Sequence, residues 1–272
     1  MDLSKVKLVV SDMDGTLLNS KGEVSNRFFE LFDELQKHQI HFTAASGRQY
    51  NSIVHKLAAI KNDIFVIAEN GGIAKKGDEV LLLNTFKPER LAEIIPILRT
   101  IDDSYIVLCG KDSAYIETSD EKFIEMFHEY YTTYTVVDDL TKIINEIDFL
   151  KIAVYHFDSS EKHIYPKIKH VEKDFLLKVS GQHWLDISDA NANKGNALRT
   201  VQKSLKITKE ETLVFGDYHN DLEMLEEAFF SFAMKNAHSD VKKIARFETE
   251  SNNDFGVEKI LEKLIEAQEK KS

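Results

Sequence analysis

The sequence predicts an α/β protein: a parallel sheet with helices on both of its faces, and a second, α+β unit inserted into the chain. Two observations support this fold class. Short apolar runs alternate with segments of helical spacing at both ends of the chain, up to about residue 84 and again from about residue 188. Between these limits the order changes to one helix followed by two strands, repeated, which is typical of an antiparallel sheet with helices against it.

The first strand is predicted at the apolar run of residues 8–10. It is followed by two carboxylates two positions apart, Asp12 and Asp14, and Gly15 then allows the backbone to turn sharply. A turn rich in Asp and Gly would explain this segment without any chemistry. Two carboxylates at the end of a buried strand repel each other, however, and a bound divalent cation is the usual compensation.

The next two elements are a helix and a second strand. Ser25 is typical of an N-cap, and apolar residues follow it at helical spacing. The strand predicted at residues 40–45 stops at Ser46 and Gly47, where another helix is expected to begin. Backbone N–H groups at such a helix start favour an anion, although an ordinary serine N-cap explains the serine alone at least as well.

The third strand is predicted at residues 63–68. It ends near Asn70 and Gly71, a dipeptide that marks a turn. Residues 72–74 and 80–83 are expected to pair after this turn as a hairpin. The first part of the chain therefore predicts three strands with two intervening helices, followed by a hairpin, as in a parallel sheet flanked by helices.

The inserted unit is expected to begin with a helix opened by Pro88. Its other predicted elements are strands at 105–108, 114–118, 149–157, 175–180 and 184–187, and helices at 123–130 and 161–172. We expect a core domain made of residues 1–84 and 188–272, and an inserted domain of residues 85–187.

The chain then returns to the alternating pattern. A polar loop over residues 188–195 leads into a helix that contains Lys194 near its start. A strand at 212–215 ends in a polar sequence with Asp217, Asn220 and Asp221. Further predicted elements are helices at 222–225, 237–245 and 260–265 and a strand at 230–234.

Composition excludes several classes of protein. The net charge is −11, with 46 acidic against 35 basic residues, which disfavours nucleic acid as the main partner. No apolar run approaches the ~20 residues of a membrane helix, and no signal peptide is recognisable. The single cysteine, Cys109, follows an apolar run and is expected to be a buried small hydrophobe. We expect a cytoplasmic protein that binds neither nucleic acid nor membrane.

Polar side chains gather at four places in the predicted core. Each alone is explained by turn or cap chemistry, but the carboxyl ends of parallel strands are where ligands bind in open α/β sheets. Phosphoryl transfer needs a nucleophile, a proton donor, a divalent cation, and cationic or N–H groups around the phosphoryl oxygens. The four places are Asp12 with Asp14, Ser46 with Gly47, Lys194, and Asp217 with Asn220 and Asp221.

This set resembles the haloacid dehalogenase-like (HAD) hydrolase superfamily. The motif D-x-D-G-T stands at residues 12–16 and the motif G-D-x-x-N-D at 216–221, with Ser46 and Lys194 in order between them. The long stretch between Ser46 and Lys194, together with Asn70-Gly71, is similar to the Cof-type phosphatase subgroup. The resemblance implies a Rossmann-like core and an inserted cap domain that selects the substrate.

The resemblance also implies a role for each position. Asp12 would attack phosphorus and form an aspartyl-phosphate, while Asp14 would exchange protons with the leaving oxygen and with water. Mg²⁺ would be held by Asp12, the backbone carbonyl of Asp14, Asp217 and Asp221. The phosphoryl group would be held by Met13, Ser46, Gly47, Lys194 and Asn220. Arg48 would either contact the substrate or form a structural ion pair.

The predicted function is a magnesium-dependent phosphatase, a hydrolase of small phosphomonoesters such as sugar phosphates, nucleotides or cofactor phosphates. A phosphoryl transferase such as a sugar phosphomutase would use the same motifs, and a non-catalytic binding module with this fold is a third hypothesis. Tyr115, His183 and Trp184 of the inserted domain are either substrate contacts or packed aromatics. The sequence names neither the substrate nor the oligomeric state.

Overall fold

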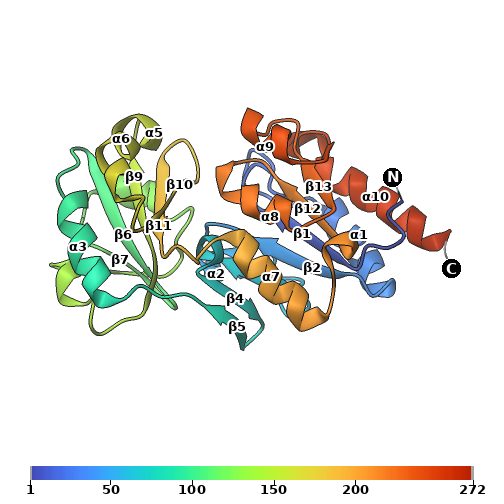
Figure 1. The fold of residues 1–272 in the computed structure, drawn as a ribbon, viewed down its shortest axis with the longest axis horizontal. Helices are drawn as coiled ribbons and strands as arrows, with labels where there is room; N and C mark the ends of the chain where they lie inside the picture. The colour runs from blue at the N-terminus through green and yellow to red at the C-terminus, as the bar shows by residue number, and fades with distance from the viewer. Residues whose placement is uncertain (1, 271–272) are drawn as a thin grey trace.

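The computed structural model describes residues 2–270, which form two sheets lying side by side (Figure 1). The first sheet has eight strands: β1 (Leu8–Asp12), β2 (His41–Ala45), β3 (Phe65–Ala68), β4 (Ile73–Lys76), β5 (Glu79–Leu83), β12 (Thr212–Gly216), β13 (Phe230–Ala233) and β14 (Phe247–Glu248). Their order is β14-β13-β12-β1-β2-β3-β4-β5. All neighbouring strands are parallel except β3–β4 and β4–β5. In this order β1 lies near the middle of the sheet, between β2 and β12.

The second sheet has six strands in the order β10-β11-β9-β6-β7-β8. These are β6 (Ser104–Gly110), β7 (Ala114–Ile116), β8 (Tyr134–Val136), β9 (Phe149–His156), β10 (Leu176–Val179) and β11 (Trp184–Ser188). All of its pairs are antiparallel except β7–β8. We call this sheet with its helices the six-stranded unit, and the rest the eight-stranded unit.

The helices are α1 (Asn26–Lys37), α2 (Tyr50–Lys56), α3 (Pro88–Leu98), α4 (Glu121–Phe127), α5 (Ser160–His163), α6 (Tyr165–Ile168), α7 (Lys194–Leu205), α8 (Leu222–Glu226), α9 (Ser239–Ile244) and α10 (Gly256–Glu269). Short 3-10 turns lie at η1 (Glu69–Gly71), η2 (Leu140–Lys142), η3 (Lys169–Val171), η4 (Lys209–Glu211), η5 (His219–Asp221) and η6 (Asn252–Asp254). Of the described helices, none is long and apolar enough to span a membrane.

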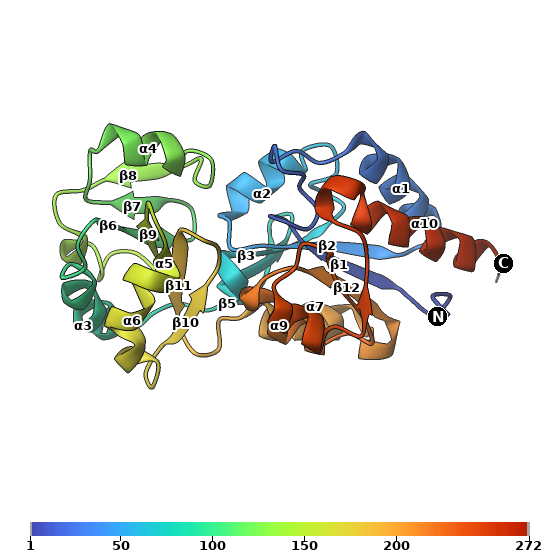
Figure 2. The same ribbon diagram turned by 90° about the horizontal axis from the view of Figure 1, so that it is seen from above.

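The eight-stranded sheet is covered on both faces because its strands are apolar on both faces. Val9 of β1 belongs to the core that contains the buried residues of α1 and α10, whereas Leu8 and Val10 belong to the core beneath α7 and α8. This is the two-residue alternation of a strand. Figure 2 shows α1, α2 and α10 on one side of this sheet and α7 and α9 on the other.

The six-stranded sheet also has helices on both faces. Apolar side chains of α3 and α6 pack with Leu108, Ile152 and Val154 on one face. Phe123 and Phe127 of α4 pack on the other face. In Figure 2, α4 accordingly lies on one side of this sheet, and α3 and α6 lie on the opposite side.

The predicted fold class is confirmed, with several local corrections. The helix expected over residues 161–172 is three short segments, because Pro166 has no N–H for the carbonyl four residues earlier. The strands β8 and β14 were not predicted, since each is only two or three residues long. Ser46 does not begin a helix: α2 starts at Tyr50 with Gln49 as its N-cap.

Candidate active site

Three carboxylates and one lysine meet at the carboxyl ends of β1 and β12. Asp12 ends β1, Asp217 follows β12 directly, Asp221 lies in η5, and Lys194 begins α7. The Lys194 Nζ donates to Asp12 Oδ1 at 2.6 Å and to Asp221 Oδ1 at 2.7 Å. Carboxylate oxygens of the three aspartates lie within 4.8 Å of one another. The two most specific sequence motifs therefore meet at one point.

Local structure explains why these side chains converge. Gly15 has φ = +79°, and a Cβ there would overlap the Asp217 carboxylate, so the turn after β1 requires glycine. The Asp221 carboxylate accepts the backbone N–H groups of Asp217 (2.9 Å) and Tyr218 (3.2 Å), which fixes the loop after β12. Thr16 donates to Asp217 at 3.2 Å.

The cluster carries more carboxylates than cationic groups: three aspartates share one lysine. Burial, and then the Asp221 carboxylate, raise the pKa of Asp12 to about 7. Burial and the Asp12 carboxylate raise the pKa of Asp217 well above its ordinary range. Burial alone would lower the pKa of Lys194, but Asp12 and Asp221 outweigh it and raise that pKa. Three hard-oxygen donors, two of them buried, together with one lysine fit a divalent cation, which would offset the remaining repulsion.

A second group of possible metal ligands lies nearby, at the surface. Within residues 2–270 the two groups are the aspartates above and the set His219, His238 and Asp240. The Asp240 carboxylate of this second set already pairs with Lys243 at 2.7 Å. Nothing in this set is as buried as Asp12 and Asp221, so the aspartate cluster is the better metal site.

Asp14 lies outside the carboxylate cluster. Its side chain is 46% exposed, and its Oδ2 and Oδ1 accept from Arg48 Nε and Nη2, both at 2.7 Å. Burial alone would lower the pKa of the Arg48 guanidinium, but its hydrogen bonds to Asp14 raise it above the ordinary value. The structure thus shows an ion pair between Arg48 and Asp14, and Arg48 also lines the cavity described next.

A cavity of about 340 Å³ opens above the cluster. Of the ten predicted site residues, seven line it: Asp12, Asp14, Ser46, Gly47, Arg48, Asp217 and Asn220. The other three, Met13, Lys194 and Asp221, are fully buried behind the lining. The structure thus brings all ten to one place, with Lys194 and Asp221 behind Asp12.

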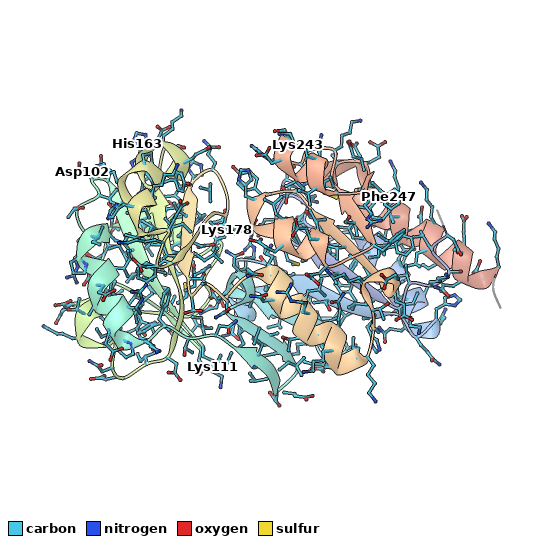
Figure 3. All side chains as sticks on the ribbon, in the orientation of Figure 1. Asp102, Lys111, His163, Lys178, Lys243 and Phe247 are labelled. Carbon is cyan, nitrogen blue, oxygen red and sulfur yellow. The ribbon has the colours of Figure 1, made fainter. Side chains whose placement is uncertain are left out.

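The opposite wall of the cavity comes largely from the six-stranded unit and is aromatic. Tyr130, His183 and Trp184 line it, and Tyr218 adds a ring from the eight-stranded unit. Tyr115 is not among the lining residues and packs against Phe149 instead. Figure 3 labels Lys178 of β10 on the side of this unit that faces the other, where it pairs with Glu223 of α8 at 2.6 Å.

Sequence reasoning missed a buried charged group at the joint between the units. Lys151 of β9 is 2% exposed and contacts Glu69 (2.9 Å) and Asp186 (3.3 Å). Burial lowers the pKa of Lys151 on its own, but the two carboxylates outweigh it and keep the lysine charged. A lysine inside the otherwise apolar run of β9 was the available signal, because a charge there needs partners. Cys109 is buried, as predicted.

Comparisons with known proteins agree with the motifs. A family model described as haloacid dehalogenase-like hydrolase matches residues 9–261. A relative from Escherichia coli K12, named 5-amino-6-(5-phospho-D-ribitylamino)uracil phosphatase YbjI, is 32% identical, covering 96% of both chains. Phosphatase YwpJ of Bacillus subtilis is 27% identical over 96% of this chain and 100% of its own. The solved structure of SMU.1108c from Streptococcus mutans matches with a TM-score of 0.88 at 27% identity, covering 96% of this chain and 99% of that one.

Proposed function

Because the chain belongs to the haloacid dehalogenase-like hydrolases and is a phosphatase of the Cof type, we propose that it hydrolyses a small phosphorylated metabolite through an aspartyl-phosphate on Asp12. One observation carries this proposal. Asp12 lines the cavity with one carboxylate oxygen held by Lys194, whose positive charge favours the ionised form, although burial and Asp221 raise the pKa of Asp12 to about 7. A nucleophilic carboxylate needs this combination of orientation and ionisation.

The reaction has two steps. An oxygen of Asp12 attacks phosphorus, the bond from phosphorus to the ester oxygen breaks, and Asp14 gives its proton to that leaving oxygen. Water then attacks the phosphorus of the aspartyl-phosphate, Asp14 takes the water proton, and the Asp12–phosphate bond breaks to release inorganic phosphate. Both oxygens of Asp14 accept hydrogen bonds from Arg48, so the arginine competes with the proton for this carboxylate.

The other predicted residues hold the phosphoryl oxygens. Ser46, the Gly47 and Met13 N–H groups, Asn220 and Lys194 supply donors around the position above Asp12. Lys194 also neutralises part of the charge of the carboxylate cluster, and its complete burial keeps that interaction strong. Donors that are already oriented stabilise the charge that develops in transfer without reorganising.

Mg²⁺ is the metal we propose for the aspartate cluster. Asp12, Asp217 and the backbone carbonyl of Asp14 would hold it, with Asp221 behind them. When bound, the cation supplies positive charge next to the phosphoryl oxygens. The hard-oxygen donors, with two carboxyl pKa values raised by burial and mutual repulsion, support this assignment.

The six-stranded unit is the proposed cap, with domain limits at residues 85 and 187. Its aromatic side chains form the cavity wall opposite the carboxylates, where the leaving group of a phosphomonoester would lie. The E. coli relative is named for a substrate that carries a uracil ring and a phosphoribityl chain, and rings such as Tyr130 and Trp184 suit a planar group. We propose that compound as the first substrate to test.

Phosphate release tests the proposal. The panel contains the ribitylaminouracil phosphate, sugar phosphates, nucleotides, flavin mononucleotide, pyridoxal phosphate and p-nitrophenyl phosphate, each with Mg²⁺ or with EDTA. We expect Mg²⁺-dependent turnover by the wild type, none by Asp12→Asn, and full activity in Asp33→Asn, an exposed control on α1. Turnover by Asp12→Asn at the wild-type rate would rule out the aspartyl-phosphate.

A further inference from the structure

Lys151 joins the two units at a point next to the phosphate site. It extends from β9 of the six-stranded unit, and its Nζ donates to the backbone carbonyl of Gly47 in the eight-stranded unit at 2.6 Å. The side chain is 2% exposed, and Glu69 and Asp186 compensate its charge. A buried lysine costs free energy unless all its donors are used, so this geometry is specific.

The carbonyl that Lys151 holds belongs to the same peptide as the Arg48 N–H. Because a peptide is planar, a hydrogen bond to the Gly47 oxygen also orients that N–H. The Arg48 N–H donates to Ser46 Oγ at 3.1 Å. This bond occupies an acceptor position of the serine, and within residues 2–270 its hydroxyl proton has no protein acceptor. The proton is therefore available for an oxygen in the cavity that Ser46 lines.

The peptide before Gly47 is held differently. The Ser46 carbonyl accepts the backbone N–H of Asn70 at 3.0 Å, a bond within the eight-stranded unit. The next peptide, Gly47–Arg48, is held from the six-stranded unit by Lys151. The loop of residues 46–48, which follows β2, is thus held in its conformation by both units.

A second connection runs parallel to the first. Asp186 of β11, which contacts Lys151, accepts from the Asn70 side chain, and Asn70 Oδ1 accepts from Asn220 Nδ2 at 2.9 Å. Asn220 is another of the proposed phosphate ligands. The Lys151–Asp186 pair therefore reaches the loops after both β2 and β12.

We propose that Lys151 is a positioning residue for phosphoryl transfer: by holding the Gly47–Arg48 peptide from the six-stranded unit, it directs the Ser46 hydroxyl toward the phosphoryl group. The phosphate site is then complete only when the two units are seated against each other. This inference rests on the proposed function, because it assigns Ser46 to the phosphoryl oxygens.

A double-mutant cycle tests it. The measured quantity is kcat/KM for p-nitrophenyl phosphate with Mg²⁺. The effect of Lys151→Met is measured once in the wild type and once in the Ser46→Ala variant. We expect Lys151→Met to lower kcat/KM by about 10-fold or more when Ser46 is present, and by less than about 3-fold when Ser46 is replaced. Equal losses in the two backgrounds, or no loss in either, would overturn the proposal.

Glu69→Gln is the matched control, because the Glu69 carboxylate belongs to the same buried cluster, whereas the donor to the Gly47 carbonyl is Lys151. We expect it to change kcat/KM by less than about 3-fold in both backgrounds. A loss as large as that of Lys151→Met would assign the effect to the charge of the cluster and overturn the role of the peptide contact.

Folding and function are controlled separately. If Lys151→Met does not fold, the cycle is repeated in a Glu69→Gln background, where the loss of the lysine leaves one fewer unpaired carboxylate. The double variant Lys151→Met/Glu69→Gln is then compared with Glu69→Gln, with and without Ser46→Ala. Wild-type turnover and its loss in Asp12→Asn test the proposed function. If the wild type is active but the effects of Lys151→Met and Ser46→Ala are additive, only the role of Lys151 is rejected and the proposed function stands.

Discussion

Arg48 donates from Nη1 to the backbone carbonyl of Glu129 at 2.5 Å, and thereby connects the eight-stranded to the six-stranded unit. The same guanidinium binds both oxygens of Asp14, and it lies 4.8 Å from the centroid of the Tyr130 ring. The proposed proton donor and the proposed cap thus share one arginine. Movement of the six-stranded unit would change the partners of Arg48 and, through them, the freedom of Asp14.

Arg48→Lys should weaken the contacts with Asp14 and with the Glu129 carbonyl, since lysine cannot form a bidentate hydrogen-bonded pair with a carboxylate. We expect a loss of about 1–3 kcal/mol in the free energy of unfolding, because the buried Arg48 guanidinium makes charge-assisted hydrogen bonds to Asp14 and to the Glu129 carbonyl that lysine would not restore. Arg99→Lys is the control: Arg99 pairs with Glu117 and Asp139 at a more exposed position, where a loss below about 1 kcal/mol is expected. Urea titration measures both, and equal losses would contradict the importance of burial at Arg48.

Asp14→Asn should separate the two chemical steps. With p-nitrophenyl phosphate the leaving group departs without a proton, so we expect a burst of nitrophenolate close to one equivalent of enzyme, followed by slow turnover. With an alkyl phosphate, the first step also needs the proton, and we expect a loss of about 10²–10⁴-fold without a burst. Stopped-flow absorbance checks the burst. Asp12→Asn should give none, and an unchanged steady-state rate in Asp14→Asn would exclude the acid–base role.

Asp12→Asn should stabilise the metal-free protein in a pH-dependent way. Burial and Asp221 raise the pKa of Asp12 to about 7 in the folded state, from an ordinary value of 3.8. Between these values the folded protein binds this proton more tightly than the unfolded chain, so its stability falls as pH rises. Removing the carboxyl should therefore add roughly 1–3 kcal/mol to the free energy of unfolding at pH 8 and much less at pH 4.

The measurement is urea unfolding in EDTA at the two pH values. Asp33→Asn provides the control, as an exposed substitution on α1 that should have the same small effect at both. A stabilisation by Asp12→Asn that is equal at pH 4 and pH 8 would mean that Asp12 does not titrate in this range.

Mg²⁺ should raise the melting temperature of the wild type by binding the folded carboxylate cluster. At a hundredfold excess over the dissociation constant, the gain is about 2.7 kcal/mol, or several degrees. Asp217→Asn removes one carboxylate ligand of the proposed metal site and should abolish most of this rise in melting temperature, whereas Asp33→Asn should preserve it. Thermal unfolding with and without Mg²⁺ shows the difference, and a full shift in Asp217→Asn would place the cation elsewhere.

The convergence of the candidate site residues was predictable because these residues follow local signals. Apolar runs mark the strands: Asp12 ends β1, and Ser46 and Asp217 directly follow β2 and β12. In a parallel sheet the carboxyl ends of neighbouring strands meet at the same edge, so positions far apart in the chain could be brought together without a structure. The N-cap at Ser25 and the helix start at Pro88 were likewise readable from short-range capping rules.

The joint between the two units was decided only by the tertiary structure. The contacts of Arg48 with Glu129 and of Lys151 with Gly47 join residues 81 and 104 positions apart, and no local pattern encodes them. Periodicity and turn chemistry act over a few residues, whereas the pairing of buried charges depends on how two folded units dock. The sequence by itself therefore determined which residues meet at the candidate site, and the docking of the units determined which residues hold them in place.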